Sequence, residues 1–139
     1  MQYEVEPIAD RPITILKLVG ELDASCYLEV IAKVQNLYDD GHHNLILDLS
    51  EMPFMASSGL VSLHSIALIM QGKTPLNPEQ GWQALHAISN DVGDTNSTLQ
   101  NCKLLFPQPR VAKTLKMTGF DNLFAQFSER KVAIQSFSE

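Results

Sequence analysis

The feature that most constrains the fold is a short apolar run at residues 44–49, which lies between two segments of helical periodicity. Its composition is typical of a strand that other layers cover on both faces. In the preceding segment, residues 24–38, apolar side chains recur at helical spacing, and the following segment, to about residue 71, is apolar nearly all round. A helix followed by such a strand predicts a mixed or parallel sheet in an α/β fold.

Two strands are expected before this unit. Residues 12–19 alternate between apolar and polar positions with Lys17 turned outward, and a shorter alternating run spans about residues 3–8. The Asp10-Arg11-Pro12 connection between them is typical of a turn. The two strands are therefore predicted to form a hairpin.

Regular patterns resume near the C-terminus. Residues 103–106 predict a strand, Pro109 favours the start of a helix and Gly119 favours its end. Residues 120–127 then predict a short strand or turn, and Ser128 is expected to cap a final helix. The apolar side of that helix is expected to comprise Val132, Ala133, Ile134 and Phe137.

Residues 72–101 differ in character from the rest, because glycine, proline and asparagine are frequent there. A structureless loop of this length is uncommon inside a compact domain. Trp82 and the apolar residues after it recur near helical spacing, so a flexible insertion and a docked extension both remain open. We expect residues 1–139 to form a single domain with an insertion at about 72–101.

The acidic charge balance excludes large classes of function. The formal net charge is -6, and no window holds more than two adjacent basic residues. Nucleic-acid binding draws most of its affinity from basic side chains that neutralise phosphates, and anionic membranes attract basic segments in the same way. Neither kind of partner is expected.

Targeting and redox signals indicate a cytoplasmic protein. The first residues are acidic where a signal peptide would be basic, and no apolar stretch reaches the roughly 18 residues of a membrane span. Cys26 and Cys102 lie far apart without metal-ligand spacing, which favours two reduced, buried thiols.

The histidines and serines do not form a catalytic or metal-binding pattern. His42 and His43 are adjacent, His64 and His86 stand alone, and surface or turn positions are favoured for them, so no metal or cofactor is expected. A Ser57–His64 pair would lie seven residues apart on one helix, about 10 Å along its axis, which is too far for proton transfer. We therefore expect no enzymatic activity.

The serines at the start of the second helical segment admit two interpretations. Ser57 or Ser58 is favoured as the helix N-cap, just as Asp23 is expected to cap the helix at 24–38 and Gly41 to end it. The same geometry would also make an exposed phosphoacceptor, because a phosphate there would lie near free backbone N–H groups and the positive end of the helix.

Three segments in order resemble the STAS domain, the family of bacterial anti-sigma factor antagonists and their relatives. Gly20-Glu21-Leu22-Asp23 is similar to the family's G-E-L-D. Leu45-Ile46-Leu47-Asp48-Leu49-Ser50, with Met52, Phe54 and Met55 after it, resembles the strand that leads to the switch loop. Ala56-Ser57-Ser58-Gly59-Leu60 resembles D-S-S-G-L, and Lys103 to Phe120 resembles the later strand–helix unit.

The resemblance implies an α/β fold with a mixed four- to five-stranded sheet and about four helices packed mainly on one face. It also implies a non-catalytic protein that binds an anti-sigma factor or serine/threonine switch kinase through the switch loop and second helix. The kinase would phosphorylate Ser57 to end the complex, and a metal-dependent phosphatase would reverse this. The partner-binding residues implied are Asp23, Ala56, Ser57, Ser58, Gly59 and Leu60.

Two departures from the family pattern support an alternative. Ala56 stands where the family has an acidic residue, and the 72–101 segment follows the implied docking helix. The alternative is a constitutive STAS-type scaffold subunit of a larger complex, in lipid transport or stress signalling, without a phosphorylation switch.

Overall fold

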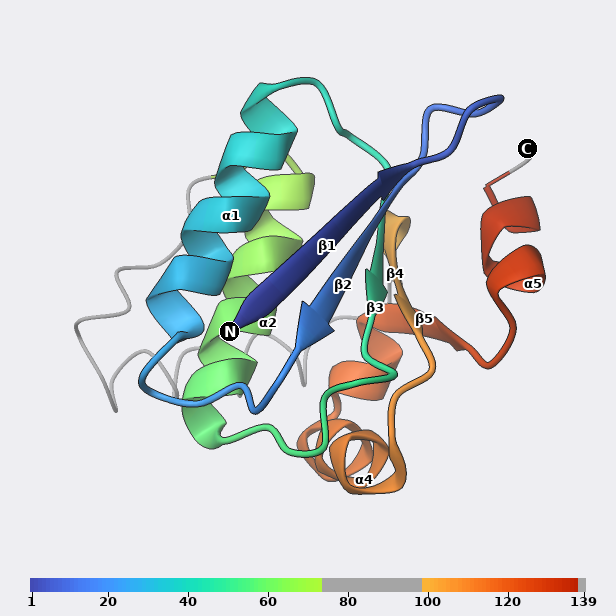
Figure 1. Ribbon diagram of the computed structural model, residues 1–139. Coiled ribbons are helices and arrows are strands. Elements are labelled where there is room, and N and C mark those ends of the chain that lie inside the picture. Colours follow the sequence, from blue (N-terminus) through green and yellow to red (C-terminus); the bar gives the residue numbers. More distant parts are fainter. Residues whose placement is uncertain (74–98, 138–139) are drawn as a thin grey trace.

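The computed structural model describes residues 1–73 and 99–137, which form a mixed five-stranded sheet in the order β1-β2-β3-β4-β5 (Figure 1). β1 and β2 form an antiparallel hairpin, and each later neighbouring pair is parallel. The hairpin and the mixed sheet are as predicted. The strands are β1 (Gln2–Pro7), β2 (Thr14–Val19), β3 (Leu45–Asp48), β4 (Leu99–Leu105) and β5 (Phe124–Phe127).

The helices cover the two faces of the sheet unequally. The two longest pack against each other on one face, α5 lies on the other, and α4 lies near the end of the sheet where β3 and β4 finish (Figure 1). Packing mainly on one face is therefore confirmed. The described helices are α1 (Tyr27–Asp39), α2 (Ser57–Met70), α4 (Pro109–Thr118) and α5 (Arg130–Gln135), with a 3-10 turn, η2 (Phe120–Asn122).

β3 is buried on both faces, as its composition predicts. Leu45 and Leu47 belong to the main core under α1 and α2, whereas Ile46 belongs to a smaller cluster under α5. All three side chains have no exposed surface. A strand with apolar side chains on both faces is stable only between two layers, and this fixes β3 at the centre of the sheet.

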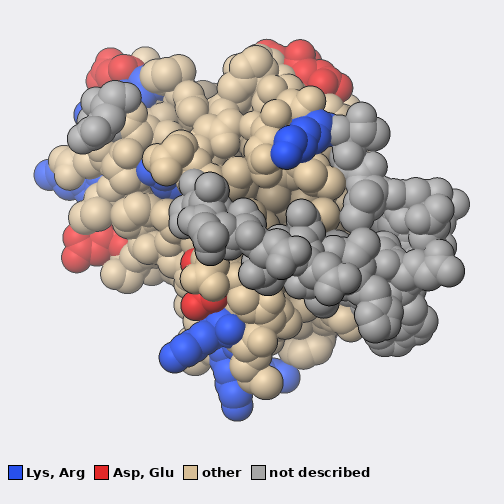
Figure 2. Space-filling model, turned by 180° about the vertical axis from the view of Figure 1, so that it is seen from behind, with Lys and Arg blue, Asp and Glu red and all other residues tan. Residues whose placement is uncertain are grey.

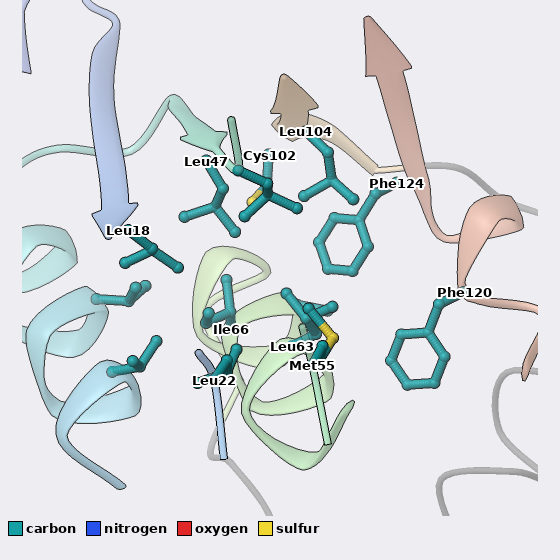
Figure 3. Packing of buried hydrophobic residues seen from close by; sticks show 14 of the residues in the cluster. Leu18, Leu22, Leu47, Met55, Leu63, Ile66, Cys102, Leu104, Phe120 and Phe124 are labelled. Carbon is teal, nitrogen blue, oxygen red and sulfur yellow. The ribbon is translucent and has the colours of Figure 1, made fainter. Parts of the chain in front are cut away.

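The main core lies between the strands and α2 (Figure 3). Side chains from β2, β3 and β4 point toward Leu63 and Ile66 of α2, and Phe124 of β5 closes the far end. Leu22 and Met55, from the two loops that precede α1 and α2, lie beside the same helix. The core therefore extends from the strands into these loops.

Two helices end in glycine-terminated Schellman motifs. Gly41 has φ +100°, its N–H donates to the Tyr38 carbonyl, and the His42 N–H donates to the Leu37 carbonyl. Gly72 ends α2 in the same way, with φ +75°. A left-handed residue at this position satisfies carbonyls that the helix leaves free, so Gly41 acts as the predicted stop.

Several predicted boundaries are wrong. Asp23 does not cap α1, because the helix begins at Tyr27 with Cys26 as its N-cap. Ser128 does not cap α5 either, since Glu129 holds that position without a side-chain hydrogen bond. Val132 is 44% exposed rather than inward-facing, because α5 is short and buries chiefly Ala133.

The predicted insertion lies mostly outside the described residues, as do Trp82 and His86. Its last three positions, residues 99–101, form the start of β4, which begins four residues earlier than predicted. Cys26 and Cys102 are free and buried, and burial raises the pKa of the Cys102 thiol to about 12. A thiol with so high a pKa is unreactive at neutral pH.

Candidate functional site

Two loops that leave the same end of the sheet are joined by backbone hydrogen bonds. The Gly20 N–H donates to the Glu51 carbonyl at 3.0 Å, and the Leu22 N–H donates to the Phe54 carbonyl at 3.0 Å. The Ala56 N–H then donates back to the Leu22 carbonyl at 2.9 Å. These bonds continue the parallel pairing of β2 and β3 beyond the strands, so the loops form one unit. The loop at residues 49–56 is called the switch loop below.

This pairing brings together two motifs that lie far apart in the sequence. Asp23 follows Leu22 directly, and Ser57 follows Ala56 directly, so both flank the hydrogen bond that joins their neighbours. The G-E-L-D and A-S-S-G-L segments therefore form one surface at the start of α2.

Gly59 is required by the close approach of the two loops. A Cβ atom at this position would lie 2.4 Å from Met55 Cγ, 3.0 Å from Leu22 Cγ and 3.2 Å from the Leu22 carbonyl oxygen. The first of these distances is far below van der Waals contact, and the last involves backbone. Only glycine lets the first turn of α2 pack so closely on Leu22 and Met55.

The N-cap residue of α2 is Ala56 rather than Ser57 or Ser58. Its backbone is extended, with φ -80° and ψ 174°, and no side chain caps the helix. The prediction of a serine cap is therefore wrong. Ser57 is instead the first helical residue and is exposed, and Ser58 is the second and is half-buried. The Ser57 hydroxyl thus lies at the positive end of the helix dipole, open to solvent.

Asp23 stabilises the turn before α1. Its Oδ1 accepts hydrogen bonds from the Ser25 N–H at 2.9 Å and from the Ser25 hydroxyl at 2.6 Å. These bonds, the hydroxyl first, hold the pKa of the Asp23 carboxyl below its usual range. Asp23 is therefore ionised at neutral pH and adds a negative charge near the start of α2.

Most of α2 is inaccessible. Its buried positions include His64, which is 3% exposed, so the surface or turn position expected for this histidine is wrong. Gly59 and Leu60 are also buried and shape the site from beneath. Of the predicted docking helix, the first turn around Ser57 is what a partner can reach.

α4 supports the switch loop through contacts that the sequence interpretation missed. The Gln108 side-chain amide donates to the Ser50 carbonyl at 2.7 Å. The Arg110 guanidinium lies over the Phe54 ring, 5.1 Å from its centroid. The sequence signal for this support is the polar Gln108 and Arg110 on either side of Pro109, at a helix start that follows a strand.

The described residues show no metal-binding or membrane-spanning element. Within residues 1–73 and 99–137, no three His, Cys, Asp or Glu side chains gather closely enough to hold a metal ion. In the same part of the chain, no helix has the length and apolar character needed to cross a bilayer. What the site offers chemically is an exposed hydroxyl at a helix N-terminus, held on two rigidly paired loops.

Ala56→Asp is expected to stabilise the protein by about 0.5–2 kcal/mol, because aspartate at an N-cap accepts a hydrogen bond from a free N–H of the first turn. Urea denaturation monitored by circular dichroism measures the change. Ala56→Leu serves as the control, since leucine cannot accept the bond. A destabilised Ala56→Asp variant would show that the site cannot hold a carboxylate.

Comparison with known proteins finds a family resemblance in the first half of the chain. Residues 4–71, from β1 to the C-terminus of α2, match the family model of the STAS domain. This range contains all the predicted site residues. No curated protein matches the chain in a sequence comparison.

Solved structures extend the likeness to nearly the whole chain. A Thermotoga maritima protein described as a candidate anti-sigma factor antagonist matches with a TM-score of 0.72 and 16% identity over 99% of this chain and 95% of its own. An anti-sigma factor antagonist from Mycobacterium paratuberculosis matches with a TM-score of 0.64 and 17% identity, over 99% and 94% of the two chains. The phosphorylated form of the Bacillus cell fate determinant SpoIIAA matches with a TM-score of 0.55 and 18% identity, over 96% and 98%. Residues 4–71 therefore resemble a STAS domain, and the fold of the chain is that of the solved anti-sigma factor antagonists.

Proposed function

We propose that the chain is a non-catalytic signalling module that binds an anti-sigma factor or serine/threonine switch kinase and is regulated by phosphorylation of Ser57. The observation that carries the proposal is the exposed Ser57 hydroxyl at the first position of α2, beside the paired loops. The likeness to antagonist structures, one of them in a phosphorylated form, supports the same role.

The partner would contact the switch loop, the turn at Asp23 and the first turn of α2. These segments present half-buried Asp23, Ala56 and Ser58 around exposed Ser57. The buried Gly59 and Leu60 would set the shape of this surface without large contacts of their own. A rigid surface favours binding, because little conformational entropy is lost when it docks.

A phosphate on Ser57 would be well accommodated by the folded protein. It would add about -1.5 to -2 charges next to the positive end of α2, where anions are stabilised. The same group would occupy the centre of the docking surface and add charge beside Asp23. Phosphorylation would therefore block the partner by charge and bulk while leaving the fold intact.

A metal-dependent phosphatase would remove the phosphate and restore binding. The pathway would be a cytoplasmic one that regulates transcription.

Ala56 favours a second candidate function. Its side chain lacks the carboxylate that the family motif places before the phosphoacceptor, and a kinase or phosphatase that recognises this group would lose it. The second candidate is a constitutive STAS-type scaffold subunit of a larger complex, in lipid transport or stress signalling. It would use the same surface without phosphorylation.

The test combines partner capture with phosphate labelling. Affinity purification of the full chain followed by mass spectrometry is expected to recover a serine/threonine kinase of the anti-sigma type. That kinase, with ATP and Mg²⁺, is expected to label the wild type on Ser57 and to leave Ser57→Ala unlabelled. A recovered complex without such a kinase, and without phosphate on Ser57, would favour the scaffold role instead.

A further inference from the structure

We propose that the exposed face of α4 is a second docking surface, which binds an acidic surface of the same protein partner that contacts the switch loop. The proposal rests on the function proposed above for the switch loop. It adds a positively charged region, whereas the predicted site residues include no basic side chain.

The face is basic in an otherwise acidic protein. Arg110, Lys113 and Lys116 are spaced three residues apart, so they follow one another along one side of the helix, and all three are exposed. The ten-residue helix holds no acidic residue, whereas the chain as a whole has a net charge of -6. In Figure 2, basic side chains gather at the lower end of the molecule, where Figure 1 places α4.

These three cations have no ion-pair partner in residues 1–73 and 99–137, whereas Lys17 is paired with Glu51 and Arg130 with Glu6. Helix stability accounts for Lys116, which lies in the last turn of α4 where a positive charge is favourable, but not for the other two cations. Like charges at this spacing repel one another, and Arg110 lies in the first turn, where a positive charge opposes the helix dipole.

The basic face is continuous with the switch loop. Arg110 packs on Phe54, and Gln108 holds the Ser50 carbonyl, so α4 begins where the switch loop turns toward α2. From there the helix extends about 15 Å. Met117, near its end, is 75% exposed and adds apolar area to the same region. A protein docked on the switch loop would reach this face without a change in either element.

The charge pattern favours an acidic protein surface over a nucleic acid. Three cations on one short helix are fewer than the phosphate contacts that give strong binding to DNA. Exposed Glu21 and half-buried Asp23 lie beside the same site and would repel a long polyanion. A folded partner can present carboxylates to α4 alone, and such complementarity mainly speeds association.

The test uses a charge-reversed pair and a control of equal charge. Lys113→Glu/Lys116→Glu removes two cations from α4 and takes the formal charge from -6 to -10, as does Lys73→Glu/Lys131→Glu, which alters exposed lysines outside α4. The probe is an oligoglutamate peptide, followed by amide chemical shifts in NMR. The wild type is expected to show shifts in α4 that weaken with salt. Affinity is expected to fall on the order of tenfold in the α4 variant and to change less than about twofold in the control.

Three results would overturn the proposal. The first is the absence of peptide-induced chemical shift changes in α4. The second is an equal loss of peptide affinity in the α4 variant and the control variant. The third is tighter binding of a DNA duplex or an anionic vesicle to α4 than of the peptide.

Labelling of Ser57 by its kinase is a separate readout. If Ser57 is labelled while α4 shows no response, the α4 proposal fails and the proposed function stands. If α4 responds while Ser57 is not labelled, the proposed phosphorylation fails.

Discussion

Ser57→Asp is expected to abolish binding of the partner, with a loss of affinity on the order of a hundredfold or more. The carboxylate would lie at the centre of the docking surface, where the bound partner excludes water. A buried carboxylate without a counter-charge, or one that faces an acidic group of the partner, costs several kcal/mol of binding free energy. Isothermal titration calorimetry with the captured partner measures the loss.

The position of Ser57 allows binding to be separated from folding. At the first residue of α2 a negative charge interacts favourably with the helix dipole, so Ser57→Asp should be as stable as the wild type or about 0.3–1 kcal/mol more stable. Ser57→Asn is the matched control, because asparagine has the size of aspartate without its charge, and it is expected to retain most of the affinity. Equal binding of Ser57→Asp and wild type would contradict a charge-based switch.

Local sequence patterns predict the elements of this fold because the elements depend on local periodicity. The apolar run at 44–49 predicts a central strand, and the structure buries Ile46 on one face and Leu47 on the other. Gly41 and Gly119 predict helix ends, and both adopt the left-handed backbone conformation there. In each case the residue type and its near neighbours determine the conformation.

The exact positions of the helix starts could not be predicted in the same way. Asp23 has the chemistry of an N-cap, but its carboxylate binds Ser25 in the preceding turn. The serines of A-S-S-G-L also suit a cap, yet the Ala56–Leu22 hydrogen bond fixes Ala56 there and places both serines inside the helix. A long-range backbone contact thus overrode the local preference.

The candidate site depends even more on contacts between distant segments. The residue types in G-E-L-D and A-S-S-G-L indicate a surface, but their pairing through Leu22 is a property of the folded chain. The support of the switch loop by Gln108 and Arg110 comes from a segment that lies 58 residues later in the chain, counted from Ser50 to Gln108. The hydrophobic periodicity of the sequence does not predict such contacts, because they depend on how the folded sheet positions its loops.

Leu22→Ala is expected to destabilise the protein by about 2–5 kcal/mol and to disrupt the site. The Leu22 side chain has no exposed surface and packs in the main core beside Met55 and α2, so its loss removes apolar burial and leaves a cavity. The cavity would lie under the first turn of α2, and partner binding should fall even among folded molecules. Leu45→Ala is the control, because Leu45 is equally buried but lies at the start of β3, away from the switch loop. It should lose similar stability and keep its affinity.

A double-mutant cycle with Gly59→Ala tests whether Leu22 and α2 are in direct contact. Gly59→Ala alone is expected to cost about 1–3 kcal/mol, because the added Cβ meets Leu22 and Met55. In the Leu22→Ala background the contact with Leu22 Cγ no longer exists while the closer contact with Met55 Cγ remains, so the same substitution should cost less, by about 0.5–1 kcal/mol. Urea denaturation of the four proteins gives the coupling energy. Simple additivity would show that the Leu22 side chain does not contribute to the cost of a side chain at Gly59, which would contradict a direct contact between Leu22 and the first turn of α2.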